Sequence, residues 1–230
     1  IELRRGSAVK TTLTIDFISD VACPWCVVGL LSLEKALEAF PDVTPEFRLH
    51  PYELEPNVGK DGENLIELIV EKYDASPDDV RDGLAQIARR GSELGFEYNF
   101  TDQSRVWNTF DAHRFIHWAD RYGKALEMKK ALFKAYFTDN RNPGDFELLT
   151  GLAAESGLDA AEAGRMLASG ELMEEVRAEI NLWRERGVNA VPTIRLQNRM
   201  TITSAQTVAS YEQSIRAVLE GAFAKGMSLT

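Results

Sequence analysis

The chain of 230 residues holds 36 acidic side chains against 26 Lys and Arg, which gives a formal net charge of -10. This balance argues against a nucleic-acid partner, because phosphate binding needs a basic face. A hydrophobic fraction of 44% is ordinary for a soluble globular protein, and no apolar run approaches the roughly 18 residues of a membrane span. Residues 1–6 show no apolar signal core, so we expect a cytoplasmic protein without a membrane partner.

The first elements are a strand and a helix on either side of the tetrapeptide Cys-Pro-Trp-Cys at 23–26, which holds both cysteines. Residues 11–19 are rich in β-formers and alternate imperfectly between apolar and polar, which predicts the strand. Proline is tolerated in the first helical turn, and apolar residues then recur with a period close to 3.6 up to Pro41. A second strand is expected at 46–49.

The middle of the chain has almost no strand character. Ser76 marks the clearest helix start, with a capping serine, a proline at the first helical position and acidic residues in the first turn, and Gly95 suits the end of that helix. Helices are expected at 64–73, 76–94, 107–122, 123–137, 146–156, 160–168 and 171–186.

Strand character returns at 191–196 and 200–203, and a final helix is expected at 207–219. The two β-containing ends together make one α/β unit of the thioredoxin type, and the helical block is an insertion between them. The expected division is a thioredoxin-like domain at 1–56 and 172–230 and an inserted all-α helical domain at 57–171.

The position of Cys23 at a strand-to-helix turn predicts a reactive thiol. Unpaired backbone N–H groups and the helix dipole stabilise negative charge there, and the thiolate is the nucleophilic form. Cys26 lies within reach to close a disulfide. A chain of this size builds its core without staples, so a redox-active dithiol is favoured over a structural bridge or inert thiols.

Three segments carry a resemblance to a known family. They are DVACPWC at 20–26, NTFDAHR at 108–114, and GVNAVPT at 187–193 followed by SAQ at 204–206. With these motifs the chain resembles the DsbA-like thioredoxin-fold oxidoreductases, specifically the FrnE-type subgroup. A C-x-x-C after the first strand, with a Val-Pro before the last pair of strands, is a strong signal.

The resemblance implies a cis peptide bond between Val191 and Pro192, with Pro192 against the dithiol. The backbone of Val191 would pair with an incoming peptide like an added strand. Thiol–disulfide exchange is the implied reaction, in which Cys23 forms a mixed disulfide and Cys26 resolves it. The implied substrates are protein or small-molecule thiols and disulfides, and isomerisation falls within the same chemistry.

Three further residues of the first motif are candidate site residues. Pro24 opens the helix, and Trp25 offers an apolar contact surface beside the sulfur where DsbA itself carries a histidine. Without that histidine, the strength of the dithiol as an oxidant is in question. Asp20, three residues before Cys23, has two readings: a group that caps the helix or modulates a thiol proton, or an ordinary turn aspartate.

Two other functions stay open. The related kappa-class glutathione transferases and hydroxychromene-carboxylate isomerases usually carry serine in place of the first cysteine, so Cys23 and Cys26 together favour dithiol chemistry over a glutathione-dependent isomerase or transferase. A peptide-binding module with the dithiol as a redox latch is the non-enzymatic alternative. We expect no cofactor, with glutathione as a candidate co-substrate.

His113 and His117 raise the question of a metal, because their i, i+4 spacing on a predicted helix puts them on one face. With the two cysteines they would make a Cys₂His₂ zinc set. The separation between the two pairs is long, and the H-E-x-x-H pattern is absent. We therefore expect no metal and a packed helix face for both histidines.

Overall fold

The computed structural model describes residues 11–221, and its central sheet has four strands in the order β2-β1-β5-β6. Strand β1 (Thr11–Ser19) is central: it runs parallel to β2 (Val43–Pro51) and antiparallel to β5 (Thr193–Leu196). Strand β6 (Met200–Thr203) pairs antiparallel with β5 at the edge. The strand predicted at 11–19 is confirmed with those bounds.

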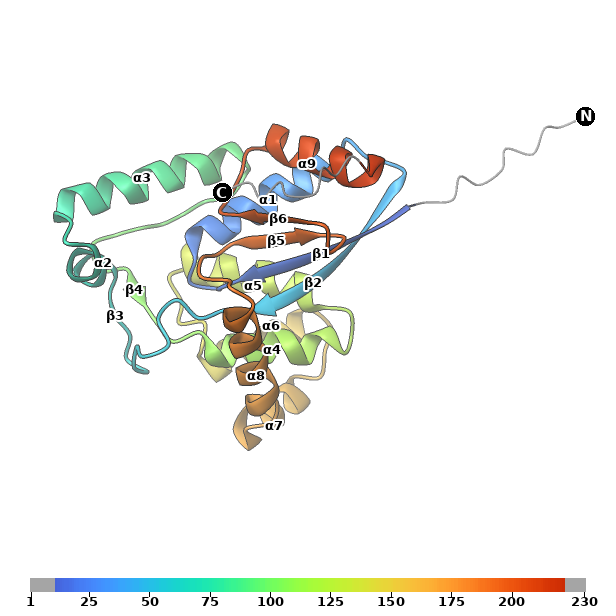
Figure 1. Ribbon diagram of the computed structural model, residues 1–230. Coiled ribbons are helices and arrows are strands. Elements are labelled where there is room, and N and C mark those ends of the chain that lie inside the picture. The colour runs from blue at the N-terminus through green and yellow to red at the C-terminus, as the bar shows by residue number, and fades with distance from the viewer. Residues whose placement is uncertain (1–10, 222–230) are drawn as a thin grey trace, which may run out of the picture.

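Helix α1 (Pro24–Leu37) returns the chain from β1 to β2 across one face of the sheet, as a parallel pair of strands requires. On that face the alternating residues Leu13, Ile15 and Phe17 are fully buried and share one hydrophobic core with α1 and with α9 (Val208–Glu220). In Figure 1, α1 and α9 lie together above the strands. This packing holds the start of α1 against the end of β1.

Strand β2 is longer than the predicted 46–49. It pairs with β1 in register from Val43 opposite Thr11 to Pro51 opposite Ser19. Residues 43–48 are half-buried or exposed, so their pattern carries little of the burial signal that marks a strand. Pairing with β1, rather than local sequence, therefore sets the length of β2.

Between β2 and β5 the described chain holds seven helices and one short antiparallel strand pair. The pair, β3 (Glu63–Asn64) with β4 (Arg105–Val106), has no counterpart in the sequence pattern. Because β4 occupies the segment just before it, the helix predicted at 107–122 begins only at Phe110. The helices are α2 (Leu65–Tyr73), α3 (Pro77–Glu93), α4 (Phe110–Asp120), α5 (Ala125–Phe137), α6 (Phe146–Glu155), α7 (Ala160–Ser169) and α8 (Met173–Glu185).

The start of α3 confirms the predicted cap. The Ser76 hydroxyl accepts a hydrogen bond from the Asp79 amide at 3.1 Å, and the Asp79 carboxylate accepts one from the Ser76 amide at 3.3 Å. This reciprocal pair satisfies two N–H groups that the helix leaves unpaired. After the helix, Gly95 adopts φ +79°, a conformation that favours glycine.

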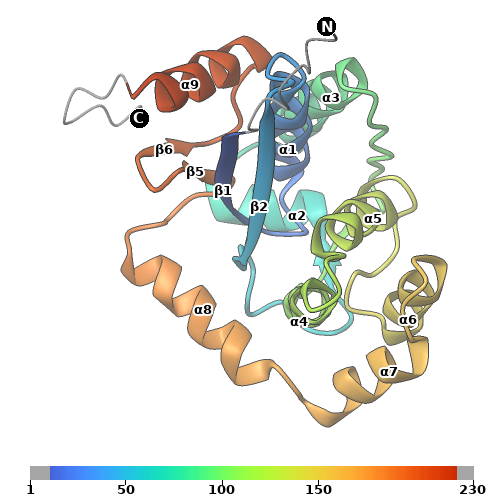
Figure 2. The same ribbon diagram turned by 90° about the vertical axis from the view of Figure 1, so that its right-hand side faces the viewer.

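Two large hydrophobic cores and a small cluster of Ile18, Tyr52 and Trp183 hold the described part of the chain together. The larger one joins the sheet, α1 and α9 to α3 and the end of α5, and the second joins α4, α5, α6, α7 and α8. In Figure 2, α8 returns the chain to the sheet on one side of the molecule, while α5 and α6 lie on the other. The architecture is a thioredoxin-like α/β fold with helices inserted between β2 and β5. Within the described range, none of the helices is long and apolar enough to cross a membrane.

Candidate active site

The turn after β1 places Cys23 at the N-cap of α1. Its backbone is extended, Pro24 takes the first helical position, and no side chain caps this end of the helix. The first backbone N–H groups of α1 therefore lack intrahelical partners close to Cys23. The Cys26 amide donates to the Cys23 carbonyl at 3.0 Å, and both cysteines are free thiols. The two sulfurs thus belong to one turn at the positive end of a helix.

The two thiols differ in their surroundings. Cys23 is 4% exposed and lines a cleft, whereas Cys26 is fully buried. Burial raises the pKa of Cys26 well above its ordinary value, and the neighbouring Cys23 adds to the rise. The positive charge of Lys129 and the backbone N–H of Asp20 act in the opposite direction. This arrangement suits Cys23 for attack and Cys26 for the later resolving step.

The loop before β5 closes over the dithiol. The peptide bond between Val191 and Pro192 is cis, and the Cys23 thiol donates to the Val191 carbonyl at 3.6 Å. On its other side the loop packs on α1: a Cβ added to Gly29 would lie 2.9 Å from the Pro192 ring. The lack of a side chain at Gly29, which the sequence pattern does not mark, therefore lets Pro192 approach the helix that carries the cysteines.

Cys23 opens on an apolar cleft of about 430 Å³, here called the dithiol cleft. Trp25, 41% exposed, stands beside it. Helices α2, α3 and α5 each contribute to the lining, and Tyr136 and Phe137 of α5 belong to it. The further apolar side chains that line the cleft are Leu54, Leu65, Leu68, Ile69, Leu84, Ile87, Phe100, Val106 and Val191.

Charged groups of the dithiol cleft are engaged elsewhere. Arg105 lines it, but its guanidinium donates to the carbonyls of Asp61 at 3.1 Å and Gly62 at 2.8 Å. Glu55 lines it as well and pairs with Lys72. The cleft is therefore suited to apolar groups beside a sulfur.

Asp20 lies beneath the dithiol and is buried. One carboxylate oxygen accepts from the Leu54 amide at 2.7 Å; the other accepts from the Ala22 amide at 3.3 Å and lies 3.2 Å from His113 Nε2. Burial alone would raise the pKa of Asp20, but the hydrogen bonds and the charge of His113 lower it overall. Asp20 therefore ties the end of β1 to α4 and to the segment after β2.

Side chains of the segment 108–114 form hydrogen bonds to distant parts of the chain. Asn108 donates to the Pro56 carbonyl at 3.1 Å, and His113 meets Asp20. Buried Arg114 donates to the carbonyls of Met166, in the last turn of α7, and Glu171, between α7 and α8, at 2.8 Å each. The resemblance marks this segment, but only the structure gives its residues these roles.

The two histidines of α4 differ in burial and in their partners. His113 is buried as expected, but His117 is 38% exposed beside Glu179, so the expected packed face is wrong for His117. Within residues 11–221, no set of three or more His, Cys, Asp or Glu side chains is arranged to hold a metal ion.

Two residues near the dithiol have no signal in the sequence. The Tyr98 hydroxyl donates to the Pro24 carbonyl at 2.6 Å, and burial raises the pKa of Tyr98. Lys129 of α5 is 1% exposed and donates to the Ser19 carbonyl at 3.4 Å. Burial lowers the pKa of Lys129 to about 8. A lysine in a helical pattern ordinarily indicates a solvated face, so the sequence does not indicate that Lys129 is buried.

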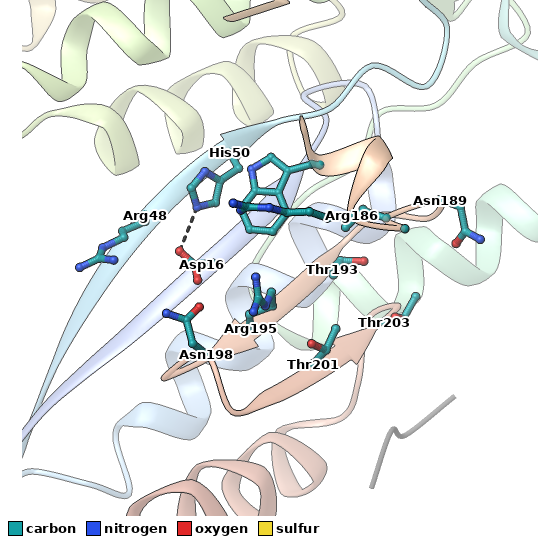
Figure 3. Close-up of a pocket in the computed structure, with 13 residues that line it drawn as sticks. Asp16, Arg48, His50, Arg186, Asn189, Thr193, Arg195, Asn198, Thr201 and Thr203 are labelled. Carbon is teal, nitrogen blue, oxygen red and sulfur yellow. Dashed lines mark hydrogen bonds and ion pairs between the residues drawn. The ribbon is translucent and has the colours of Figure 1, made fainter. Parts of the chain in front are cut away.

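A larger hollow of about 780 Å³ lies elsewhere, over the polar face of the sheet. Figure 3 shows Asp16 against His50 at 3.0 Å and Arg195 and Thr201 on β5 and β6. The His50 ring also meets Glu179. Neither cysteine lines this hollow, so size alone does not identify the reactive site.

A free dithiol at a helix N-terminus, under a cis-proline loop, defines a thioredoxin-fold thiol–disulfide redox site. A family model described as "DSBA-like thioredoxin domain" matches residues 14–216. The chain therefore belongs to the DsbA-like family of thiol–disulfide redox enzymes.

Known proteins are similar to this chain. The uncharacterized protein YwbO of Bacillus subtilis is 31% identical over 185 residues, which cover 79% of this chain and 86% of YwbO. The crystal structure of a probable DsbA oxidoreductase, SCO1869 of Streptomyces coelicolor, is similar with a TM-score of 0.84 and 29% identity, over 95% of this chain and 94% of that chain. The cytosolic disulfide reductase DsbM of Pseudomonas aeruginosa shares the fold at 20% identity, with a TM-score of 0.60 over 91% and 98% of the two chains.

Proposed function

We propose that this protein is an oxidoreductase that exchanges disulfides with protein or peptide substrates through Cys23 and Cys26. The single observation that carries the proposal is the placement of Cys23. Its thiol lies at the N-cap of α1, faces the Val191 carbonyl and lines an apolar cleft. The unpaired N–H groups at the start of the helix lie close to this sulfur, and the cleft gives a substrate disulfide a route to it, which suits the thiol to exchange.

In the reducing direction, the Cys23 thiolate attacks one sulfur of the substrate disulfide. That bond breaks, the first substrate thiolate leaves and takes a proton from solvent, and a mixed disulfide remains. Cys26 then loses its proton and attacks the Cys23 sulfur, which releases the second substrate thiolate. The substrate gains two electrons, and Cys23 and Cys26 become a disulfide. Oxidation of a substrate dithiol is the reverse sequence.

The surrounding residues supply substrate contacts in this proposal. The half-buried Val191 backbone next to Cys23 pairs with an extended peptide as an added strand would. Trp25 and the dithiol cleft cover apolar side chains that flank the substrate sulfur, and Pro24 and Pro192 shape the two sides of the dithiol. A peptide with bulky apolar residues next to its disulfide fits this surface.

Insulin disulfide reduction tests the proposal. Cys23→Ser is expected to abolish it, because the attacking sulfur is lost. Cys26→Ser is expected to accumulate a mixed disulfide between Cys23 and the substrate, visible by mass spectrometry under non-reducing conditions. Wild-type insulin reduction by Cys23→Ser would sink the proposal.

Glutathione is a candidate co-substrate that recharges the dithiol, and the DsbM structure solved with GSH supports testing it. A glutathione-dependent isomerase or transferase of the same fold is the alternative reaction. The two are separable, because such a transferase needs only one sulfur site. Turnover of an aromatic substrate that requires glutathione and survives Cys26→Ser would favour the alternative.

A further inference from the structure

The hollow of about 780 Å³ over the polar face of β5 and β6 has no role in the dithiol reaction; it is here called the polar hollow. Residues that alternate along a strand share one face of the sheet. In the register of these two strands, Thr193 stands opposite Thr203 and Arg195 opposite Thr201. All four line the polar hollow, so the sheet presents hydroxyl and guanidinium donors side by side.

Two arginines of the polar hollow lie over one aromatic ring. The guanidinium carbons of Arg186, at the end of α8, and of Arg195 are 5.0 and 5.6 Å from the centre of the buried Trp183 ring. Within residues 11–221, neither forms an ion pair with a carboxylate, whereas Arg48 in the same hollow pairs with Glu46 at 2.8 Å. Stacking on a ring leaves the edge N–H groups of a guanidinium available, so both arginines retain donors for an anion.

The acidic group of the polar hollow does not neutralise these two arginines. Asp16 stands opposite Arg195 in the strand register, but its carboxylate meets His50 Nε2 at 3.0 Å instead. The other nitrogen of His50 meets Glu179. Because the whole chain has a formal net charge of -10, this basic hollow is a local exception to the overall charge, and an anionic partner complements it.

A single loop separates the polar hollow from the dithiol cleft. Asn189 lines both spaces, and Figure 3 shows it at one side of the polar hollow. Two residues further on, the Val191 carbonyl accepts from the Cys23 thiol at 3.6 Å. Five residues of extended chain span at most about 18 Å. A peptide that pairs with Val191 therefore reaches Arg186 within about five residues of its own cysteine.

Hydrogen bonds hold both ends of this loop in place. Gly187 adopts φ +86° after α8, and the Val188 amide donates to the Trp183 carbonyl at 3.0 Å. At the other end, the Thr193 hydroxyl donates to the Ala190 carbonyl at 2.7 Å. The two arginines and the cis-proline loop therefore keep a fixed spacing, so a peptide that contacts both meets a preorganised surface.

We propose that the polar hollow is a second contact site for polypeptide substrates, in which Arg186 and Arg195 bind acidic side chains about four to six residues from the substrate cysteine. This rests on the proposed function, in which Cys23 exchanges disulfides with a peptide paired to Val191. A carboxylate accepts hydrogen bonds in parallel pairs from the edge of a guanidinium. The dithiol cleft then selects apolar side chains next to the sulfur, and the polar hollow selects acidic ones farther along the peptide.

Two peptide disulfides that differ only in charge test the proposal. Each is a symmetric disulfide of a peptide with leucine beside its one cysteine, and about four to six positions away on both sides it carries either glutamate or glutamine. The measurement is the rate constant for oxidation of the pre-reduced protein, followed by alkylation and mass spectrometry and divided by the same peptide's rate with mercaptoethanol. The wild type should react about fivefold faster with the glutamate peptide, the effect of two partly exposed ion pairs. The net charge of -10 alone would give the opposite order.

Variants of the two arginines locate the preference. Arg186→Gln and Arg195→Gln should each lower the glutamate preference, and the double variant should abolish it. Arg199→Gln is the matched control, because exposed Arg199 in the turn between β5 and β6 does not line the polar hollow, and it should keep the full preference. Raising the salt concentration from about 0.1 M to about 1 M should weaken the wild-type preference, since the Debye length falls from about 10 Å to about 3 Å. If Arg195→Gln does not fold, Arg186→Gln at an exposed helix end still decides.

The remaining outcomes are also decisive. A glutamate preference that survives in Arg186→Gln would overturn the proposal. Thermal stabilisation by inorganic phosphate that Arg186→Gln loses, with equal wild-type rates for the two peptides, would assign the hollow to a small anion instead. A dimer in sedimentation analysis that Arg186→Gln dissociates would assign it to a second copy of the chain. If neither peptide oxidises the wild type, the proposed function itself fails, whereas equal oxidation by both removes only the role of the polar hollow.

Discussion

The two sides of the dithiol differ in the polarity of the side chains that surround them. Cys23 faces the dithiol cleft, where apolar side chains from α2, α3 and α5 line a space open to a substrate. On the side of Cys26 lies a buried polar layer in which Asp20, His113 and Lys129 are each at most 3% exposed. In the proposed reaction, the substrate covers the first side. The residues proposed to contact the substrate are thus separate from those that lie in the buried layer.

The polar layer should also dominate the stability of this region. Asp20→Ala leaves the Leu54 amide without its 2.7 Å acceptor and leaves His113 unpaired inside the protein. Breaking a buried pair on one side costs about 3–5 kcal/mol. The free energy of unfolding, measured by urea titration with circular dichroism, should fall by this amount.

Asp139→Ala is the control for this loss. Asp139 pairs with Lys134 at 2.8 Å, but both side chains are largely exposed, and exposed pairs contribute about 0–1 kcal/mol. Equal losses of unfolding free energy in Asp20→Ala and Asp139→Ala would contradict a buried polar layer on the side of Cys26.

The open side of the dithiol was the more predictable from sequence. The cysteines and Trp25 lie in a short segment with its own local signal, the strand-to-helix turn, and the family resemblance implied the cis bond of the Val-Pro dipeptide. The buried polar layer on the side of Cys26 takes its hydrogen-bond partners from α4 and α5, about ninety residues or more away along the chain. No local pattern brings Asp20 to His113, since only the packed insertion does so.

The same reason explains the errors in the fold. The cap at Ser76 and the strand at 11–19 depend on neighbours in sequence and were predictable. The full length of β2 and the β3–β4 pair depend on partners far along the chain, which a periodicity argument does not see. The division of the chain at 56/57 and 171/172 stays a prediction.

Trp25 tests the open side with a smaller expected effect. Because the side chain is 41% exposed, Trp25→Ala should leave the free energy of unfolding within about 0.5 kcal/mol. Loss of its contact surface should lower kcat/KM for insulin reduction about tenfold, the size expected for an aromatic contact residue. Leu182→Ala, which removes an equally exposed apolar side chain of α8, should not change kcat/KM. If Trp25→Ala keeps the wild-type kcat/KM, Trp25 does not contact the substrate.

A second carboxylate–histidine group, at Glu179, is partly exposed and can be compared with the buried pair of Asp20 and His113. Glu179 of α8 meets both His50 and His117 while remaining partly exposed. Burial works against ionisation of Glu179, but the hydrogen bonds and charges of His117 and His50 lower its pKa from 4.5 to about 2. The hydrogen bond with Glu179 raises the pKa of His117 above 6.5, against the effect of burial.

These shifts give a pH window with a definite sign. The depressed pKa of Glu179 stabilises the fold above pH 4.5, and this contribution is lost as pH falls toward about 2. The raised pKa of His117 stabilises the fold below pH 6.5, and this contribution is lost as pH rises through the raised value. The difference in unfolding free energy between wild type and Glu179→Gln should therefore peak between pH 4.5 and 6.5, at about 1 kcal/mol. Glu93 forms an exposed ion pair with Arg90 on helix α3, so the Glu93→Gln difference should be flat over the same pH range. A flat profile for Glu179→Gln would show that water weakens the Glu179 group as it does any surface pair.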